Sequence, residues 1–331
     1  MAAQRQESHL RTYGVGIIGL GVMGRAMAEA MAAHPRFRVV AGFDPAIGPE
    51  DPIRDRVALC ADAASVAADP AVDCLYVASP PARHEDAVRL AVAARKPLLC
   101  EKPLAATTEA AWRSVEAVEA ARLPAAVNFI FATEPAAVRL AALAQSGALG
   151  PVEAARLTLR FRAWPRGWQR RAGSWLAGAA EGGFTREVAS HFLFLANRLL
   201  GRPRIDQVSV ERGSAGTETR LGARLVYPAA TLEIDGAVAG EREDENRFEL
   251  IGSKGTVALI DWERLERDGA PVALEPAPAG QLDGLAALLD GKPHSLCSFR
   301  EAAEVVDLVE AMLAARTGSP FAGGGPAAQP R

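Results

Sequence analysis

Three glycines near the N-terminus have the spacing of a dinucleotide-binding loop. Gly19, Gly21 and Gly24 form a G-x-G-x-x-G pattern with Val22 and Met23, directly after the apolar run "VGII" and directly before an Ala-rich stretch. In such a loop the glycines permit a tight turn and let the backbone approach a pyrophosphate at the positive end of the following helix. The pattern in this context predicts a bound dinucleotide rather than an ordinary glycine-rich turn.

An acidic residue follows the next apolar run. Asp44 ends the run "FRVVAGFD", 25 residues after Gly19, where a carboxylate can accept hydrogen bonds from the adenosine ribose and repel a 2′-phosphate. Its neighbours Pro45 and Ala46 offer no positive charge, so we expect NAD in preference to NADP. Arg54 and Arg56 lie further on and leave NADP possible, and a helix or turn cap is the alternative role of the aspartate.

A pair of opposite charges follows a third apolar run. The stretch "PLLC" reads as a buried strand, and it is followed at once by Glu101, Lys102 and Pro103. A strand buried on both faces normally ends on turn residues. Adjacent opposite charges before a proline therefore suggest a functional site at this strand end.

The elements around these residues alternate between strands and helices. Apolar, β-branched runs predict strands at 13–19, 37–43, 57–61 (weakly), 73–79, 97–100 and 125–131. Ala-rich amphipathic stretches predict helices at 22–33, 85–95 and 108–122. This alternation predicts an α/β Rossmann domain, a doubly wound parallel sheet, over residues 1–124.

The pattern changes after this point. We expect helices at 134–145, 186–200, 282–289 and 299–316 and strands at 151–163, 205–211, 220–227, 230–238, 247–252 and 256–261. Turn signals such as Asp235-Gly236 separate strands that have no helix between them. Residues 125–316 are thus predicted to form an α+β domain with a large, mostly antiparallel sheet, for substrate binding and oligomerisation. The Gly- and Pro-rich residues 317–331 are expected to be a flexible tail.

Composition narrows the class of protein. The chain has 331 residues, 49% of them hydrophobic, with a net charge of -3 and no dense Lys/Arg run, which argues against a nucleic-acid partner. Its four cysteines are far apart and form no metal-binding cluster. The polar N-terminus and the lack of a segment of about 18 apolar residues predict a cytoplasmic protein without a membrane span.

Residues 69–105 resemble the nucleotide domain of the glucose-fructose oxidoreductase, inositol dehydrogenase and rhizopine-catabolism (Gfo/Idh/MocA) family. The resemblance rests on the glycine loop, on Asp73 before the fourth strand, on Pro80 and His84 after it, and on the Glu-Lys-Pro turn. It implies that Lys102 reaches the nicotinamide and the reacting oxygen of the substrate, on a cis Lys-Pro bond, while Glu101 positions the turn. It also implies cofactor contacts from Ser79, Pro80 and His84. The alternative for Lys102 is a surface salt bridge, and the alternative for His84 is a helix cap.

The same resemblance points to a second pair of residues. Family members carry Asp-x-x-x-His on a helix after a glycine-rich turn, and Glu187 and His191 match these positions. His191 is implied to act as general base or acid, with Glu187 orienting it or binding substrate; the alternative is a histidine satisfied beside an apolar helix face. Two departures stand out: Glu187 replaces the aspartate, and Ile130 occupies the place of an arginine after Asn128.

A loop before the histidine is rich in arginine and tryptophan. It contains Arg162, Trp164, Arg166, Trp168, Arg170, Arg171 and Trp175. Indole faces suit ring stacking and guanidinium groups suit anions, so an anionic or polyhydroxylated ring would fit. We expect substrate contacts from Asn128, Arg162, Trp164 and Trp168, the alternative being an interface or lid loop.

These expectations add up to an NAD(P)-dependent oxidoreductase. Hydride would move between nicotinamide and a carbinol or carbonyl carbon of a sugar, polyol, cyclic diol or related small molecule. Redox-neutral, NAD-dependent glycoside cleavage, imine reduction and a non-catalytic nucleotide sensor are the alternatives. A sheet covered by helices on one face only predicts a homodimer or homotetramer.

Overall fold

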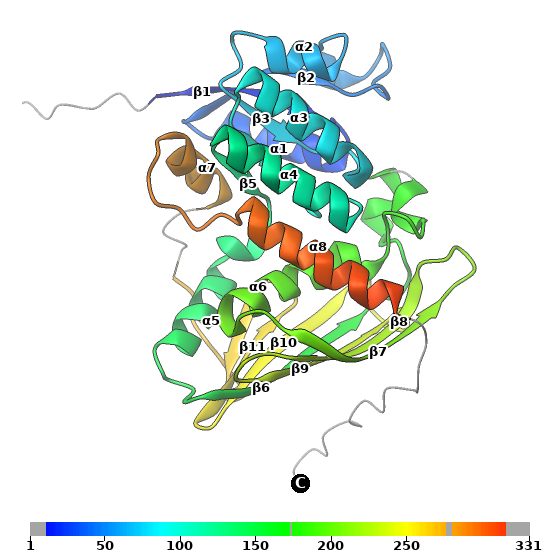
Figure 1. Cartoon of the computed structure of the whole chain (residues 1–331), viewed down its shortest axis with the longest axis vertical. Helices are drawn as coiled ribbons and strands as arrows, with labels where there is room; N and C mark the ends of the chain where they lie inside the picture. The colour runs from blue at the N-terminus through cyan, green and yellow to red at the C-terminus, as the bar shows by residue number, and fades with distance from the viewer. Residues whose placement is uncertain (1–10, 173, 276–279, 316–331) are drawn as a thin grey trace, which may run out of the picture.

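The apolar strands of the first third form a parallel sheet. The structure, a computed structural model, describes residues 11–172, 174–275 and 280–315 (Figure 1). Five strands lie in the order β2-β1-β3-β4-β5 and all pair in parallel. They are β1 (Tyr13–Ile18), β2 (Phe37–Phe43), β3 (Cys74–Val77), β4 (Leu98–Cys100) and β5 (Ala125–Val127). Every residue of β1, β3 and β4 is buried, as expected for strands covered on both faces, and the Rossmann prediction is confirmed.

Four helices connect these strands. They are α1 (Val22–Ala33), α2 (Ala63–Ala68), α3 (His84–Ala94) and α4 (Thr108–Ala121), with short 3-10 turns η1 (Pro52–Asp55) and η2 (Pro81–Arg83). The Thr107 side chain begins α4 by accepting a hydrogen bond from the backbone N–H of Ala110. The strand expected at 57–61 is reduced to a single bridge between Leu59 and Gly42, and α2 follows where no helix was predicted.

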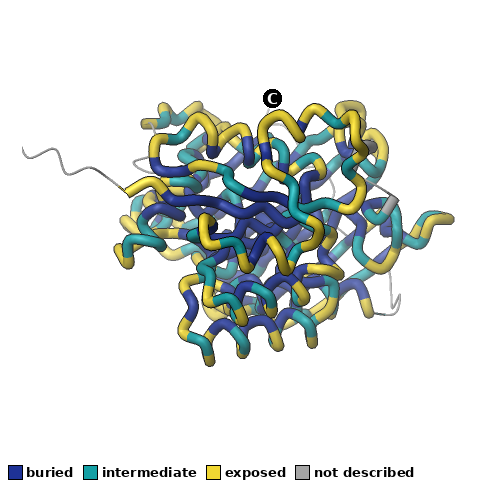
Figure 2. The backbone as a smooth tube through the Cα atoms, turned by 90° about the horizontal axis from the view of Figure 1, so that it is seen from above, coloured by how far each residue is buried: buried dark blue, intermediate teal, exposed yellow. Residues whose placement is uncertain are grey.

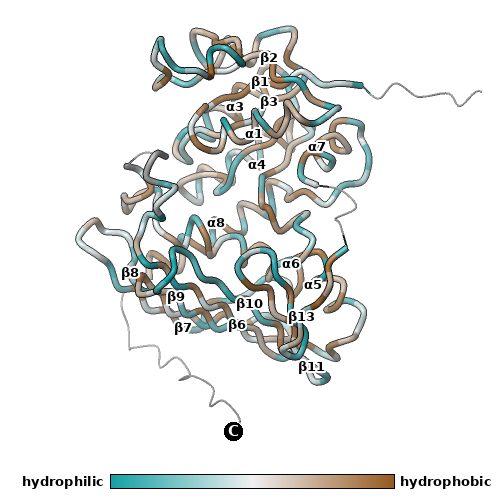
Figure 3. Tube along the Cα trace, turned by 180° about the vertical axis from the view of Figure 1, so that it is seen from behind, coloured by the Kyte–Doolittle hydropathy of each residue, from teal (hydrophilic) through white to brown (hydrophobic). Residues whose placement is uncertain are grey.

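The second sheet is larger and mostly antiparallel, as predicted. Its order is β13-β12-β11-β10-β6-β9-β8-β7, and β6 and β9 form its one parallel pair among the described residues. The strands are β6 (Val152–Arg160), β7 (Arg204–Arg212), β8 (Glu218–Val226), β9 (Thr231–Ala237), β10 (Glu245–Gly252), β11 (Gly255–Ile260), β12 (Arg264–Arg267) and β13 (Ala270–Pro271). Hydrophilic and hydrophobic residues mix along these strands, as Figure 3 shows.

Helices cover one face of this sheet. They are α5 (Pro135–Gln145), α6 (Ser190–Leu200) and α8 (Phe299–Ala314), and a π-helical turn, η6 (Thr185–Ala189), leads into α6. Leu157 of β6 pairs with Phe248 of β10, whose ring contacts Phe192 of α6. Arg156 and Arg160 alternate with these buried positions and face outward. The apolar face of β6 is thus under the helices, and the charged face is the open one.

The C-terminal part of the described chain packs on both sheets. Helix α8 crosses between the two domains in Figure 1 and shares a buried core with α4. Helix α7 (Gln281–Leu289) returns to the first sheet, where Leu285 joins the core around Tyr13, and Asp290 accepts hydrogen bonds from Tyr13 (2.7 Å) and Arg36 (2.8 Å). The sequence pattern did not indicate that α7 packs on the first sheet. The domain limits at 124 and 316 stay predictions, and the predicted tail, 317–331, lies outside the described residues.

Viewed from above, buried segments run through the middle of the molecule and exposed segments form its rim (Figure 2). The carboxyl ends of β1, β2, β3 and β4 are followed by the glycine loop, Asp44, Ser79 and Lys102, respectively. In an open parallel sheet this edge is where ligands bind. The fold therefore gathers the residues that the sequence singled out in the first domain.

Candidate active site

The glycine loop has the geometry that its residues predicted. Gly19 has a φ of +97°, and a Cβ there would lie 2.4 Å from the carbonyl carbon of Ala78. A Cβ on Gly24 would lie 2.0 Å from the carbonyl oxygen of Gly19, so helix and strand pack closely here. A Cβ on Gly21 would meet nothing within 4 Å. The loop thus needs Gly19 and Gly24 for its own fold, while Gly21 leaves the backbone open to a ligand at the N-terminus of α1.

Asp44 lies against this loop. Its two carboxylate oxygens accept hydrogen bonds from the backbone N–H groups of Leu20 and Ala46, each at 2.8 Å. The two arginines that left NADP possible have other partners, since Arg54 donates to the carbonyl oxygen of Gly48 (2.9 Å) and Arg56 pairs with Glu29 (3.1 Å). The structure therefore places a fixed carboxylate, without a free neighbouring arginine among these two, beside the glycine loop.

A cavity of about 470 Å³ begins at the glycine loop and extends to the second domain. Val22, Met23 and Ser79 line it from the first domain, and the Ser79 hydroxyl is buried without a hydrogen-bond partner among the described residues. Pro80 does not line the cavity, whereas its neighbour Pro81 does.

His84 is also turned away from the cavity. Its side chain is 1% exposed and lies between two backbone carbonyl oxygens, that of Ser79 at 2.7 Å from Nε2 and that of Pro103 at 3.0 Å from Nδ1. It makes no helix cap. His84 thus ties the end of β3 to the Lys102-Pro103 turn, whose peptide bond is cis.

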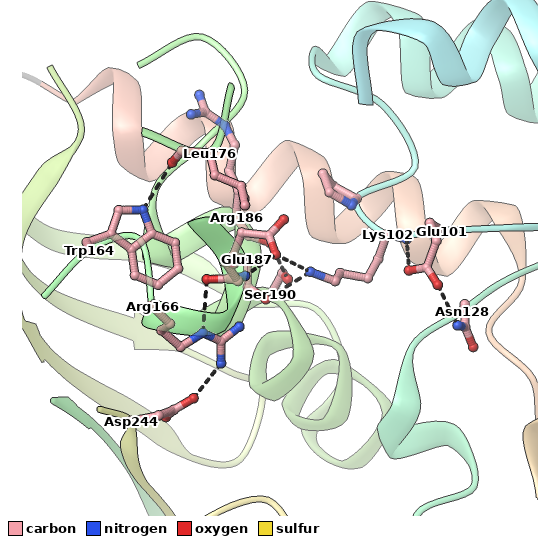
Figure 4. A network of polar contacts seen from close by, with 12 residues as sticks. Glu101, Lys102, Asn128, Trp164, Arg166, Leu176, Arg186, Glu187, Ser190 and Asp244 are labelled. Carbon is pink, nitrogen blue, oxygen red and sulfur yellow. Dashed lines mark hydrogen bonds and ion pairs between the residues drawn. The ribbon is translucent and has the colours of Figure 1, made fainter. Parts of the chain in front are cut away.

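Lys102 meets Glu187 across the two domains. Its ammonium nitrogen lies 2.9 Å from Glu187 Oε2 and 3.0 Å from the Glu187 carbonyl oxygen (Figure 4). The two side chains are 12% and 8% exposed. The pair is buried at the cavity wall, so the alternative of a surface salt bridge is wrong for Lys102.

Glu101 lies at the base of the turn, where its carboxylate accepts a hydrogen bond from the backbone N–H of Lys102 (3.3 Å). Its carboxylate accepts hydrogen bonds from the Tyr76 hydroxyl and from the Asn128 amide, the latter at 2.7 Å. Burial raises the pKa of Glu101, while these two donors act in the opposite direction. Asn128 keeps a buried oxygen without a partner among the described residues, and both residues line the cavity. This geometry fits a residue that positions the turn.

His191 is enclosed by aromatic rings. Phe129, Phe131 and Trp262 approach it edge to face, with centroid distances of 5.4, 5.9 and 5.5 Å. Its Nδ1 is buried and has no hydrogen-bond partner among the described residues. Burial, and then the positive charges of Lys102 and Arg166, hold the pKa of His191 well below its ordinary value. Burial and the two cations thus favour the neutral form of the imidazole.

The arginine- and tryptophan-rich loop divides into two parts. Trp168, half exposed, lines the cavity together with Trp175. Trp164 donates to the carbonyl oxygen of Leu176 (3.1 Å) and packs on Phe161, and Arg162 is exposed and donates to the carbonyl oxygen of Glu241 (2.7 Å). Neither Trp164 nor Arg162 lines the cavity, contrary to expectation. The side chains of Arg170 and Arg171 lie outside those described.

Several residues that were not predicted as site residues also line the cavity, and four of them are linked by polar contacts. These four are Arg166, Gln169, Asp244 and Trp262. Arg166 pairs with Asp244 and donates to Gln169 (3.1 Å), which in turn donates to Glu187 (3.3 Å). Arg166 and Gln169 could have been found from the loop composition. Asp244 and Trp262 come from turns of the second sheet, far along the chain, and carry no local signal.

Within the described residues there is no helix long and apolar enough to cross a membrane, and no group of three or more His, Cys, Asp or Glu side chains that could hold a metal ion.

Comparison with protein families assigns both domains. Residues 13–129 match the oxidoreductase family with an NAD-binding Rossmann fold, and residues 137–258 match the GFO/IDH/MocA C-terminal domain. The resemblance inferred from the Glu-Lys-Pro turn and the glycine loop is thereby confirmed.

Curated relatives carry dehydrogenase names. The chain is 36% identical to inositol 2-dehydrogenase of Acidothermus cellulolyticus over 165 residues, about half (47%) of each chain. It is 30% identical to inositol 2-dehydrogenase 1 of Saccharopolyspora erythraea over 75% of this chain and 74% of the relative. It is 29% identical to levoglucosan dehydrogenase of Pseudarthrobacter phenanthrenivorans over 80% and 77% of the two chains.

Solved structures share the fold. A levoglucosan dehydrogenase in complex with NADH and L-sorbose superposes with a TM-score of 0.78 at 20% identity, covering 92% of this chain and 96% of that one. The two domain matches and the 30% identical relative along three quarters of the sequence show that this chain belongs to the GFO/IDH/MocA family of NAD-dependent oxidoreductases.

Proposed function

We propose that this chain is a dehydrogenase that uses NAD to oxidise a carbinol carbon of a sugar, polyol or cyclic diol, or to reduce the corresponding carbonyl. One observation carries the proposal: Lys102 from the first domain and Glu187 and His191 from the second line a single cavity that begins at the glycine loop. The inositol and levoglucosan dehydrogenases among its relatives support a hydroxyl-bearing ring as the substrate class.

The residues at the strand ends fit the dinucleotide. The open backbone at Gly21 would bind the pyrophosphate. Asp44 would accept hydrogen bonds from the ribose hydroxyl groups, and its negative charge would disfavour a 2′-phosphate. The unpartnered Ser79 hydroxyl would find its hydrogen bond in the ligand. When bound, NAD supplies the acceptor or donor of the hydride.

His191 is our candidate for the proton acceptor. Its ring lines the cavity and makes no hydrogen bond with the described residues, so a ring nitrogen that faces the cavity can take the proton of a substrate hydroxyl group. In the reverse direction the protonated ring returns that proton to the carbonyl oxygen. The aromatic rings around His191 fix its ring plane.

Lys102 is our candidate for the group that stabilises charge on the reacting oxygen. Its ammonium group carries three donors, and Glu187 takes two of them in this structure. The remaining N–H can point at a substrate oxygen and favour its alkoxide form while the proton leaves. Glu187 then acts by holding the ammonium group in place, which is a positioning role.

Location and assembly stay proposals as well. We infer a cytoplasmic protein that forms a homodimer or homotetramer through the open face of the second sheet. That face carries ion pairs, among them Arg160 with Asp235 and Arg247 with Glu249 (2.8 Å). An interface there would be polar.

The test is a substrate screen with product stoichiometry. Purified protein with NAD is offered inositols, aldoses, anhydrosugars and cyclic diols, and NADH formation is compared with the amount of oxidised product. We expect one NADH per oxidised carbon. Cleavage of a glycoside without net NADH would favour the redox-neutral alternative, reduction of imines alone would favour an imine reductase, and cofactor binding without turnover on any compound would favour a sensor.

A further inference from the structure

The far wall of the cavity is built around one buried guanidinium group. Arg166 is 6% exposed, and its central carbon lies 4.9 Å from the ring centroid of Trp168 and 5.9 Å from that of Trp262. Cationic and aromatic groups at this distance attract each other. The arginine therefore supports two indole rings that line the cavity.

The position of Trp262 is maintained at a conformational cost. Its φ is +74° and that of Asp261 is +49°, a left-handed conformation that bulky residues rarely adopt. The backbone N–H of Trp262 donates to Asn246 (3.1 Å) and its indole N–H donates to Asp244 (3.2 Å). Strain of this kind persists where the surroundings enforce it and clusters at ligand sites. The turn thus directs an indole ring into the substrate cavity.

The charge of the guanidinium group is balanced by a carboxylate of the protein. Asp244 pairs with Arg166 and also accepts hydrogen bonds from Trp262 and from the side chain of Asn246 (3.1 Å), so its carboxylate is fixed. The Arg166 and Asp244 side chains are 7% and 17% exposed. The only other cation among the described side chains of the cavity, Lys102, pairs with Glu187.

The charges of the cavity therefore leave no surplus of cations. Its described lining contains two basic side chains, Lys102 and Arg166, and three carboxyl groups, those of Glu101, Glu187 and Asp244. A carboxylate or phosphate on the substrate would add a negative charge that no surplus cation of the cavity balances, and an unbalanced buried charge is unfavourable.

We propose that this cavity selects an uncharged, hydroxyl-bearing ring over the same ring carrying a carboxylate, and that Asp244 sets this preference by neutralising Arg166. The ring would lie against the Trp168 and Trp262 indoles, whose apolar faces suit the C–H face of a polyol ring. This inference rests on the proposed function and specifies its substrate class. The composition of the loop was compatible with an anionic or a polyhydroxylated ring, and this inference favours the polyhydroxylated one.

The experiment measures binding of matched ring pairs to the NADH complex. The pairs are glucose with glucuronate, galactose with galacturonate, and myo-inositol with quinate, followed by calorimetry or tryptophan fluorescence. NADH is used in every titration so that the nicotinamide carries no positive charge. For each pair that binds, we expect the neutral ring to bind about tenfold tighter or more.

Two variants identify the residue responsible. Asp244→Asn removes the charge and leaves Arg166 unpaired, so we expect the preference for the neutral ring to shrink by about tenfold. Asp261→Asn removes a carboxylate from the turn that carries Trp262, which contacts the Asp244 segment through Asn246 but places Asp261 outside the cavity lining, and it should leave the preference unchanged. Thermal denaturation checks that each variant is folded.

Each outcome decides the matter. Carboxylate rings that bind to the wild type as tightly as neutral ones overturn the inference and leave the proposed function standing, and this comparison holds even if Asp244→Asn does not fold. A folded Asp244→Asn protein with an unchanged preference overturns the role of Asp244. If no ring of either kind binds, the proposed function is overturned, and this inference with it.

Discussion

The ion pair between Lys102 and Glu187 allows stability and turnover to be separated. Replacing Lys102 with Met removes contacts of 2.9 and 3.0 Å and leaves the Glu187 carboxylate, 8% exposed, with Gln169 at 3.3 Å as its side-chain partner. Removing one partner of a buried pair costs about 3–5 kcal/mol, because the other charge remains buried. We therefore expect Lys102→Met to lose about 3 kcal/mol of unfolding free energy.

The double variant Lys102→Met/Glu187→Gln should behave differently. It buries no charge at this position, so most of the lost stability should return. Turnover should not return, because a group that stabilises or moves charge at the reacting oxygen contributes about 10²- to 10⁴-fold. Binding of NADH should stay near that of the wild type, since Gly21 and Asp44 lie at another part of the site.

The assay combines urea denaturation, NADH fluorescence titration and steady-state turnover on a substrate from the screen. Lys96→Met is the matched control, because Lys96 is a partly exposed lysine of the first domain whose ammonium group donates to the backbone carbonyl oxygens of Val72 and Asp69, so its removal leaves no carboxylate unpaired. Near-native turnover in the double variant would show that Lys102 has no catalytic role. A single variant as stable as the wild type would show that the buried-charge argument is wrong.

Four further expectations follow from the structure. Because burial lowers the pKa of His191, the acid limb of kcat/KM should lie below the ordinary histidine value of about 6.5, and a limb above that value would contradict a neutral base. Because His191 binds a proton at higher pH in the unfolded chain than in the folded protein, the free energy of unfolding should decrease as pH falls below about 6.5. Unfolding measured as a function of pH can show this. Titrations should show tighter binding of NAD(H) than NADP(H), and Asp44→Ser with Pro45→Arg should narrow or reverse this order; a native preference for NADP(H) would refute the role of Asp44. Light scattering at micromolar concentration should show a dimer or tetramer, and a monomer would exclude an interface on the open sheet face.

The parts of the fold that the sequence predicted well are those with local signals. The glycine loop, the apolar strand and the amphipathic repeat together indicate β1 and α1, and α1 covers Val22–Ala33 as expected. The Glu-Lys-Pro turn is conspicuous because its charges directly follow an apolar strand, whereas Glu187 and His191 were assigned through the family resemblance. In contrast, the short helix α2 is only Ala63–Ala68, too short for a clear periodicity.

The residues that the sequence could not assign depend on which way a loop folds. Trp164 and Trp168 are four positions apart in the same loop, yet one packs on Phe161 in the core and the other lines the cavity. Composition predicts that indoles are useful there but not which of them faces the ligand. Trp262 enters the cavity through a left-handed turn between β11 and β12, and that placement depends on contacts made across the sheet.

The polar contacts of the cavity form a chain that explains how a glutamate can work where the family resemblance leads one to expect an aspartate. Glu187 Oε2 accepts hydrogen bonds from both Lys102 and Gln169, and Gln169 connects it to Arg166 and Asp244. Figure 4 shows the pairs of Lys102 with Glu187 and of Arg166 with Asp244. The carboxylate of an aspartate would lie closer to the helix backbone, so both donors would have to move to keep these contacts. The longer carboxylate thus couples the Lys102 turn of the first domain to the wall that we propose to select the substrate. Changes in the Arg166 loop should therefore affect turnover as well as specificity, because they act on the group that holds Lys102 in place.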